Sequence, residues 1–576
     1  MDQFDTFYER KEWSVTRVLY LLAMLSAASH FFFRRYEPTA TYYLYSQAGL
    51  VVLIRVLGSV PYATGVLIVT LFNLFLGAQI VFYRLVWHDL RAFPGPKLAA
   101  ITQGWILREA YIGRTRFTMK ELAEKYGDWV RIGPNELYTT NIEALLNIMG
   151  PKGWPKGNSY DSGLTKEDAG GDSLLTLKSL SEHAARRRIW DKAFTPKAIL
   201  GYLPSLEVRI EQMLNNFDHC ISQGKDIDLC LQIGYFVYDR WNVSPLAKKL
   251  SQLQAMCDMA FGAVGGTNLL KSQHDEHQIL EQMGRVVRQV GIVRNMPWLT
   301  PIVKAWPNPQ RREQLNFRNF TKSMFLRRWK QGTGTQVDVF HYLLGEDTET
   351  ETRLTASELA ADSALIVITG ADTTRTVLIA LFLYLLRYPN HMKKLQAELA
   401  ASPDLSPTSL SRAHYLNACL QEAMRLQPPS PSNLQRVCPT GGAVIDGKYI
   451  PSGTKVRFSN YAMQRNGRYF ENPEDFCPER WLKPTQNEHA QFRGEKTRHN
   501  EKAFFPFLIG PGACVAKNLA WLEMRLVVAH LLTNYNLSFG TGFDSVAFEQ
   551  TWSDAYLLLI DQPLWVTLRP KSACAS

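Results

Sequence analysis

The chain has 576 residues, of which 46% are hydrophobic and 20% are charged, and its formal net charge is +11. This composition excludes a disordered chain, a collagen and a disulfide miniprotein. Basic residues alternate with acidic ones, as in 120–125, so we expect no nucleic-acid partner. The eight cysteines form no CxxC pair and show no zinc-ligand spacing, which favours a reducing compartment.

The N-terminal part of the chain is predicted to anchor it in a membrane. Apolar runs cover Val18–Phe33 and Tyr62–Phe82, and the second is long enough to cross a hydrocarbon core about 30 Å thick. A third run, Ala48–Val60, carries Arg55 near its middle, which is costly in a bilayer unless the charge is paired. The sequence therefore predicts one to three transmembrane helices.

The apolar runs end before Phe93-Pro94-Gly95-Pro96, where the two prolines exclude a continuing helix. We therefore expect a membrane-anchoring region at 1–92 and one large domain at 93–576. Arg84 and Arg91 follow the last run and favour a cytoplasmic location for the large domain.

Helical periodicity dominates the large domain, and strands are few. Leu200–Phe217 and Ala356–Arg387 are strong helical segments, and the second is so apolar that we expect it to be buried on all sides. Val444–Ile450 has an Asp-Gly pair between β-branched and aromatic residues, which predicts a hairpin, and Trp565–Leu568 predicts a strand. The predicted fold class is mainly α with small β-sheets.

Cys514 is the cysteine whose neighbours indicate chemistry. It lies in a loop with Phe507 and Gly510, just before a predicted helix, where the helix dipole would lower the pKa of the thiol. Gly510 would let the backbone approach a flat group, and Phe507 could cover the sulfur. A lone cysteine is more often a packing residue, so the loop indicates a ligand only together with other motifs.

Those other motifs are present, and together they resemble the cytochrome P450 family. Phe507-x-x-Gly510-x-x-x-Cys514 is similar to its haem-thiolate loop, in which Cys514 would be the axial ligand of the iron. Glu422-Ala423-Met424-Arg425 resembles the family's E-x-x-R, and Pro478-Glu479-Arg480-Trp481 resembles the motif that completes its ion-pair network. The resemblance thus implies a structural network of Glu422, Arg425 and Arg480.

Thr369–Thr374 lies within the long apolar helix and resembles the segment with which the family handles oxygen. The resemblance implies that Asp372 and Thr373 are catalytic and relay protons to the oxygen substrate. An aspartate hydrogen-bonded by neighbouring hydroxyls at a helix kink is the alternative interpretation.

Three basic residues correspond to those with which the family binds the haem propionates: His183, Arg187 and Arg436. Planar guanidinium groups suit such carboxylates. The family's usual arginine two residues before the cysteine is Gly512 here, and its usual glycine two residues after is Ala516. Without this arginine, His183, Arg187 and Arg436 would have to supply the positive charge that binds the haem propionates. The neighbouring Arg186 and Arg188 could instead belong to a charged, solvent-exposed face of the helix and have no part in haem binding.

The resemblance covers most of the chain and implies a cytochrome P450 fold with an N-terminal transmembrane anchor. It implies haem b as cofactor, with electrons from NADPH through a flavoprotein reductase and cytochrome b5 as a further candidate donor. The expected reaction is monooxygenation of a lipophilic small molecule in fungal secondary metabolism, at the endoplasmic reticulum membrane with the catalytic domain cytoplasmic. The alternatives are an oxygen-independent haem-thiolate isomerase or dehydratase and a degenerate, haem-poor membrane protein.

Two further expectations concern less constrained segments. Residues 240–257 interrupt the family pattern and are either a surface loop or a gene-model artefact, which peptide mapping of the purified chain would distinguish. By position, five segments are expected to shape the substrate pocket: Tyr160–Leu177, Asn295–Ile302, Ile366–Gly370, Pro429–Gln435 and Trp552–Leu557.

Overall fold

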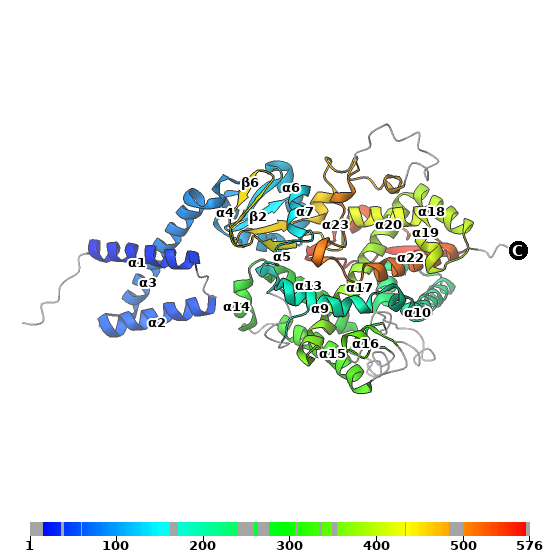
Figure 1. Ribbon diagram of the computed structural model, residues 1–576, viewed down its shortest axis with the longest axis horizontal. Helices are drawn as coiled ribbons and strands as arrows, with labels where there is room; N and C mark the ends of the chain where they lie inside the picture. Colours follow the sequence, from blue (N-terminus) through cyan, green and yellow to red (C-terminus); the bar gives the residue numbers. More distant parts are fainter. Residues whose placement is uncertain are drawn as a thin grey trace, which may run out of the picture.

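The computed structural model describes residues 15–35, 40–58, 60–161, 171–238, 259–262, 276–305, 309–332, 337–347, 354–432, 434–482 and 499–571. Three N-terminal helices extend from one end of a large helical body, and the main sheet lies in the part of the body nearest to them (Figure 1). The segment 240–257, expected to be a loop or an artefact, lies outside the described residues.

The body consists mostly of helices with short strands, which confirms the predicted fold class. Its α-helices are α4 (Lys97–Ile101), α5 (Gly104–Tyr111), α6 (Thr115–Tyr126), α7 (Ile142–Met149), α9 (Leu180–Ala193), α10 (Pro196–Ser222), α11 (Leu229–Tyr238), α13 (Glu276–Val293), α14 (Thr300–Ala305), α15 (Pro309–Gln331), α16 (Val339–Leu343), α17 (Ala356–Arg387), α18 (Pro389–Ala401), α19 (Pro407–Arg412), α20 (His414–Leu426), α21 (Asn460–Gln464), α22 (Lys517–Asn534) and α23 (Ser545–Gln550). Its strands are β1 (Trp129–Gly133), β2 (Glu136–Thr139), β3 (Ile227–Asp228), β4 (Leu434–Val437), β5 (Ala443–Ile445), β6 (Lys448–Ile450), β7 (Lys455–Phe458), β8 (Tyr535–Phe539), β9 (Ser553–Ala555), β10 (Leu557–Leu559) and β11 (Trp565–Pro570).

The strands form small sheets at the periphery of the helices. The largest has the order β1-β2-β7-β4, in which β2 and β7 are parallel and the other pairs antiparallel. A second sheet has the order β3-β11-β8, and β9 pairs with β10. The predicted hairpin is confirmed as β5 and β6, and both turn residues, Asp446 and Gly447, have positive φ, which suits the twist of a two-residue hairpin turn.

Helix α17 crosses the body and organises its core. Its bounds match the predicted segment, because Thr355 caps the first turn in a capping box with Glu358 and because Pro389 follows the last turn. The helix is long and apolar enough to cross a membrane, but 67% of its most apolar stretch is buried inside the body. It is therefore a core helix, as predicted from its all-round apolar character.

The N-terminal helices are α1 (Val15–Arg35), α2 (Ala40–Gly58) and α3 (Tyr62–Phe82). In the described part of this region, the helical stretches 16–34 and 62–87 are long and apolar enough to cross a membrane. Polar contacts join the helices: Asn73 on α3 donates to Gln47 Oε1 on α2 at 3.0 Å, and Gln79 on α3 donates to the Ala23 carbonyl on α1 at 3.1 Å. Such contacts hold helices together in lipid. The number of spans stays a prediction.

The junction between the helices and the body has the predicted form. A short helical turn ends at Ala92, and α4 begins at Lys97, so residues 93–96 with the Pro-Gly-Pro segment separate the two and are not helical. The Pro94 carbonyl accepts a hydrogen bond from the Arg131 amide of β1 at 2.7 Å. This contact ties the connecting segment to the main sheet.

Candidate haem-binding and catalytic site

The cysteine loop is held by its own backbone and by the end of α7. The Cys514 amide donates to the Phe507 carbonyl at 2.8 Å, and the Ala513 amide donates to the Gly510 carbonyl at 3.0 Å. Gly510 has φ +65°, and a Cβ there would overlap the carbonyl oxygens of Met149 and Gly150. Only glycine therefore lets the loop pack this closely and turn toward α22.

The Cys514 side chain has accessible surface and lies three residues before α22. Protein nevertheless surrounds it closely enough that burial raises the pKa of the thiol, although the Ala516 amide and the charges of Arg187 and Lys517 act in the opposite direction. The net shift is upward, so the expectation that the helix terminus lowers this pKa is wrong. Desolvation outweighs the Ala516 amide and the two nearby positive charges, and a bound metal ion is what would deprotonate such a thiol.

Phe507 contacts the cysteine through its backbone, by the hydrogen bond from the Cys514 amide. Its ring packs toward Trp521 on α22, with the ring centroids 6.3 Å apart. These contacts show that Phe507 supports the loop. That its ring covers the Cys514 sulfur stays a prediction.

The predicted proton-relay residues lie at the middle of α17. Thr369, Gly370 and Thr373 are partly exposed although the helix around them is buried, whereas Asp372 is buried. The Thr373 hydroxyl donates to the Thr369 carbonyl at 2.8 Å, and the Thr376 hydroxyl donates to the Asp372 carbonyl at 2.8 Å. Because its proton is bonded within the helix, the Thr373 oxygen has lone pairs left to accept a hydrogen bond.

A buried acid that the sequence reasoning missed lies beside this segment. Glu523 on α22 accepts a hydrogen bond from the Thr374 hydroxyl at 3.2 Å, and burial raises the pKa of Glu523 to about 8. The side chain is therefore a neutral carboxylic acid at pH 7. Its signal in the sequence is a single acid among the apolar residues of 519–532.

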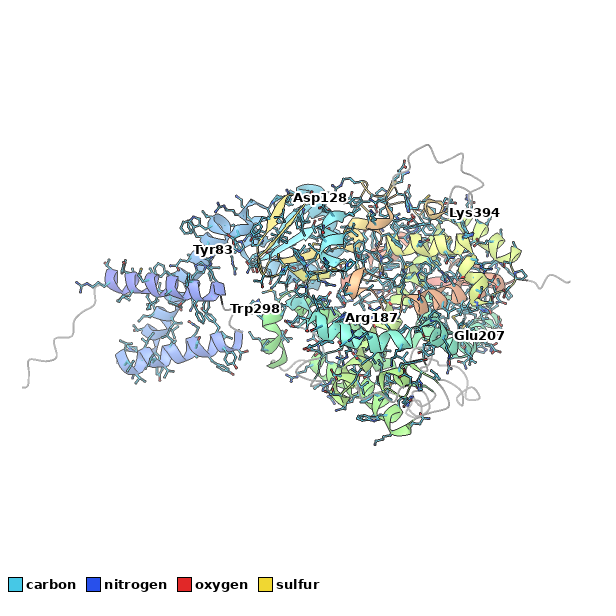
Figure 2. All side chains as sticks on the ribbon, in the orientation of Figure 1. Tyr83, Asp128, Arg187, Glu207, Trp298 and Lys394 are labelled. Atoms are coloured by element: carbon cyan, nitrogen blue, oxygen red, sulfur yellow. The ribbon has the colours of Figure 1, made fainter. Side chains whose placement is uncertain are left out.

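Of the predicted propionate partners, two differ in detail from the expectation. Burial, together with Lys156, Arg187 and Arg436, lowers the pKa of His183 to about 4, so His183 is a neutral hydrogen-bonding group at pH 7 rather than a cation. Arg187 pairs with Asp191 at 2.7 Å and donates to the Ala513 carbonyl at 2.5 Å, so it ties α9 to the cysteine loop. In the view of Figure 2, Arg187 lies on α9, toward the middle of the body.

Arg436, on β4, is buried, as His183 is, whereas Arg187 is partly exposed. Its guanidinium donates to the Tyr160 hydroxyl at 3.2 Å and to the Gln435 carbonyl at 2.9 Å. The Arg436 Nη2 also lies 3.0 Å from the position that a Cβ on Gly512 would take. Arg436 therefore reaches the cysteine loop at the residue where the family's usual arginine is missing.

The neighbouring arginines of α9 are not alike. Arg186 is buried and pairs with the buried Asp362 of α17 at 3.0 Å, so its assignment to a charged surface face is wrong. Arg188 is exposed, as that interpretation expects. A buried arginine requires such a carboxylate because desolvation of an unpaired charge is costly.

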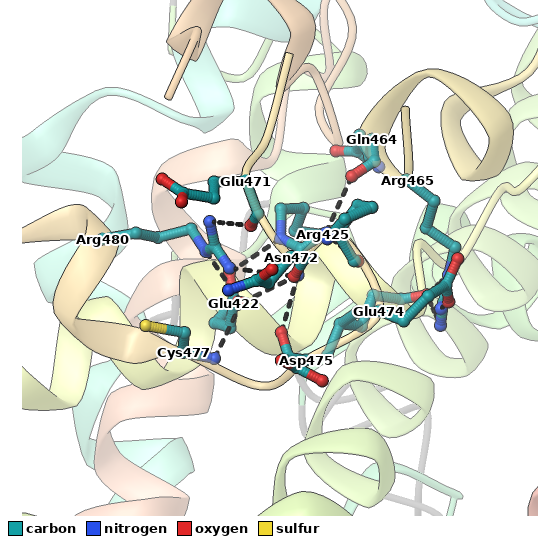
Figure 3. Close-up of polar contacts among 12 residues, drawn as sticks. Glu422, Arg425, Gln464, Arg465, Glu471, Asn472, Glu474, Asp475, Cys477 and Arg480 are labelled. Carbon is teal, nitrogen blue, oxygen red and sulfur yellow. Dashed lines mark hydrogen bonds and ion pairs between the residues drawn. The ribbon is translucent and has the colours of Figure 1, made fainter. Parts of the chain in front are cut away.

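The predicted ion-pair residues come together in one buried network (Figure 3). Arg425 donates to both carboxylate oxygens of Glu422 at 2.8 Å, and Arg480 donates to Glu422 at 3.1 Å. Burial would raise the pKa of Glu422, but the two arginines outweigh it and hold that pKa below its ordinary value. Arg425 also donates to the Gln464, Pro473 and Asp475 carbonyls, so the network fixes the chain that leads into the cysteine loop.

Two of the five predicted substrate-pocket segments, Pro429–Gln435 and Trp552–Leu557, meet beside α17. The Leu558 amide donates to the Pro429 carbonyl at 2.9 Å, and the Ser430 hydroxyl donates to the Tyr556 carbonyl at 3.3 Å. The Thr376 hydroxyl of α17 donates to the Leu558 carbonyl at 3.3 Å. Segments far apart in the sequence therefore converge next to the predicted proton-relay residues.

Comparison with known proteins identifies the family. The structure presents a cysteine on a glycine-containing loop before a buried helix, within a mostly helical body with small sheets. The family described as "Cytochrome P450" matches residues 94–564, and the chain belongs to this family. It is a cytochrome P450 monooxygenase by family and by the names of its relatives.

Three relatives illustrate the range of similarity. Cytochrome P450 67 of Uromyces fabae is 66% identical over 551 residues, which cover 96% of this chain and 99% of the relative. Cytochrome P450 monooxygenase phqL of Penicillium fellutanum is 28% identical over 486 residues, 83% of this chain and 80% of the relative. Cytochrome P450 monooxygenase orf5 of Eupenicillium brefeldianum is 30% identical over 491 residues, 84% of this chain and 91% of the relative.

The family implies a haem whose iron is bound by a thiolate, and the residues fit this group. Cys514 is accessible, and the close packing that requires Gly510 brings the loop against the end of α7. Arg436 is buried beside the cysteine loop and has no carboxylate partner among the described residues. A buried cation of this kind is suited to bind a carboxylate of the cofactor. The chemistry and charge of the donor set are therefore those that haem needs.

Proposed function

We propose that this chain is a membrane-anchored haem-thiolate monooxygenase that inserts one oxygen atom from O2 into a lipophilic small molecule in fungal secondary metabolism. The observation that carries the proposal is the contact between α17 and α22 through Thr374 and Glu523. It brings the segment with Asp372 and Thr373 next to the helix that follows Cys514.

In this proposal, Cys514 Sγ would bind the haem iron, and Arg436, His183 and Arg187 would hold the haem carboxylates or the loop beside them. The bound haem would supply the redox chemistry that activates O2, and a thiolate ligand would tune its reactivity. Asp372 provides an acid, and Thr373 provides a hydroxyl that holds a proton donor in place. The protein's part is to orient the substrate and to control the supply of protons.

We assign the electrons to NADPH, delivered by a flavoprotein reductase, with cytochrome b5 as a second candidate donor. The net charge of +11 supports this assignment because a basic protein attracts an acidic partner and speeds the encounter. The apolar stretches 16–34 and 62–87 support anchoring in the endoplasmic reticulum membrane, and Arg84 and Arg91 support a cytoplasmic catalytic domain.

The test is the difference spectrum of the reduced, carbon-monoxide-bound full chain in membranes. The wild type should show the strongly red-shifted Soret band of a thiolate-ligated haem, and Cys514→Ala should lack it. Cys220→Ala is the control, because Cys220 is a partly exposed thiol on α10, outside the loop. A band that survives in Cys514→Ala would refute the assignment of the ligand.

The same membranes distinguish a monooxygenase from an oxygen-independent isomerase or dehydratase. With added reductase and a lipophilic extract, product formation should require both NADPH and O2, and label from ¹⁸O2 should enter the product. Product formation in the absence of both NADPH and O2 would support the oxygen-independent alternative instead.

A further inference from the structure

A group of basic side chains surrounds Tyr160 near the cysteine loop. Arg294 lies 5.2 Å from the centre of the Tyr160 ring, Lys156 lies 5.6 Å from it and Arg436 lies 5.9 Å from it. Arg294 and Arg436 are buried, and Lys156 is partly buried. We call Lys156, Arg294 and Arg436 the Tyr160 cation cluster.

Lys156 and Arg436 are neighbours by backbone pairing. They face each other across an antiparallel β-bridge, and the Val437 amide donates to the Pro155 carbonyl at 2.9 Å. Residues directly opposite in an antiparallel pair present their side chains on the same face, and like charges in such a pair repel each other. The fold therefore holds two positive charges together against their repulsion.

The described part of the chain supplies no carboxylate that pairs with a member of this cluster. By contrast, Arg425 pairs with Glu422 and Arg457 pairs with Glu136. The partners of the cluster are aromatic rings, carbonyls and the Tyr160 hydroxyl, which accepts from Arg436 at 3.2 Å. Arg294 lies 3.7 Å from the centre of the Tyr556 ring, and its Nε has no described hydrogen-bond partner. Because buried cations are stable only when their charge is compensated, the cluster fits an anion.

The Lys156 ammonium is held in a fixed position. Its Nζ donates to the Leu174 carbonyl at 3.1 Å and to the Leu175 carbonyl at 2.7 Å. An ammonium has three N–H groups, so one remains for another acceptor. Burial and the charge of Arg436 lower the pKa of Lys156 to about 7, and a bound anion would raise this pKa again.

Gly512 replaces the arginine that the family usually has two residues before the cysteine, so a positive charge near Arg436 has to come from another residue. Nothing but hydrogen occupies its side-chain position, and the Arg436 Nη2 lies 3.0 Å from where a Cβ would be. The Arg436 guanidinium thus lies against the position at which a side chain at 512 would begin, and it would have to shift slightly to admit one. An arginine at 512 would supply one more positive charge to the same place.

We propose that Lys156 and Arg436 together bind a carboxylate of the haem, and that Lys156 supplies the positive charge that Gly512 does not. The inference rests on the proposed haem-binding function. A competing explanation is purely structural: Lys156 would only hold the 174–175 backbone that precedes α9.

The experiment separates charge from backbone support. Lys156→Gln keeps amide N–H donors for the Leu174 and Leu175 carbonyls but removes the charge, and Lys156→Arg keeps the charge. Lys152→Gln is the matched control, because Lys152 is an exposed lysine of the same segment. Each full-length holoenzyme is purified in detergent, and its rate of haem transfer to haem-free globin is measured together with its haem content per chain.

We expect Lys156→Gln to lose haem roughly tenfold faster than the wild type, the effect of one hydrogen bond to a charged group. Lys156→Arg and Lys152→Gln should lose haem at the wild-type rate. The double variant Lys156→Gln with Gly512→Arg should recover most of the loss, because the arginine returns the missing charge to the same part of the site, beside Arg436.

Two results would overturn the inference. One is haem loss from Lys156→Gln at the wild-type rate; the other is faster loss that neither Lys156→Arg nor the added Gly512→Arg reduces, as expected if Lys156 only supports the 174–175 backbone. A wild-type chain that purifies without haem would refute the proposed function itself, and this inference with it.

Discussion

Single residues of the cysteine loop have environments that local sequence describes only in part. Gly510 is required because its φ is positive and because the end of α7 leaves no space for a Cβ. Cys514 was expected to be acidified by the helix that follows it, but burial has the larger effect and raises its pKa. The chemical role of a residue here depends on which parts of the chain pack around it.

Gly510→Ala should prevent haem-loaded protein from accumulating. The left-handed backbone costs a non-glycine residue about 1–2 kcal/mol, and the overlap with the Met149 and Gly150 carbonyls adds to it because backbone cannot move aside easily. Gly453→Ala is the control, because Gly453 has φ +77° but open space around it. Haem content per chain is the measurement, and equal content in the two variants would contradict the overlap argument.

At the scale of elements, α17 and α22 meet through polar groups in an otherwise apolar contact. Thr374 donates to Glu523, and both side chains are buried. The raised pKa of Glu523 means that the folded protein keeps a proton that the unfolded chain releases above its ordinary pKa of 4.5. The contact between the two helices is therefore sensitive to pH.

Glu523→Gln should flatten the dependence of stability on pH. Between pH 4.5 and about 8 the folded wild type binds one proton more at this site than the unfolded chain, so its stability falls as pH rises, by up to about 1.4 kcal/mol per pH unit. Glutamine cannot titrate and removes this slope. Melting temperatures of the holoenzyme from pH 5.5 to 8.5 test the prediction, with the exposed Glu501→Gln as control, and parallel curves for Glu523→Gln and the wild type would contradict it.

At the scale of the whole molecule, the N-terminal helices project from the body and pack against one another (Figure 1). Many of their large apolar side chains are exposed, including Phe31, Leu57 and Leu67. An exposed apolar surface of this extent is stable in lipid and not in water. The long apolar α17, by contrast, is covered by the body.

Deletion of residues 1–92 should release the chain from the membrane. The full chain should stay in the pellet after alkaline carbonate extraction, because spanning helices resist it, whereas the deleted chain should move to the supernatant and keep its carbon-monoxide difference band. Immunoblots of the two fractions and the spectrum of each are the measurements. A deleted chain that stays in the pellet would place the anchor elsewhere.

The sequence alone determined the elements and the family, because these depend on local patterns. All-round apolar character predicted the buried α17, the Asp-Gly pair predicted the β5–β6 hairpin, and the ordered motifs brought Glu422, Arg425 and Arg480 into one group that the structure holds in contact. Only the tertiary structure decided how charge is distributed around the site. The pairing of Arg186 with Asp362 and the bridge between Lys156 and Arg436 join residues far apart in the chain. The pKa shifts of Cys514, His183 and Glu523 arise from burial, which depends on the packing of distant segments rather than on neighbours in the sequence.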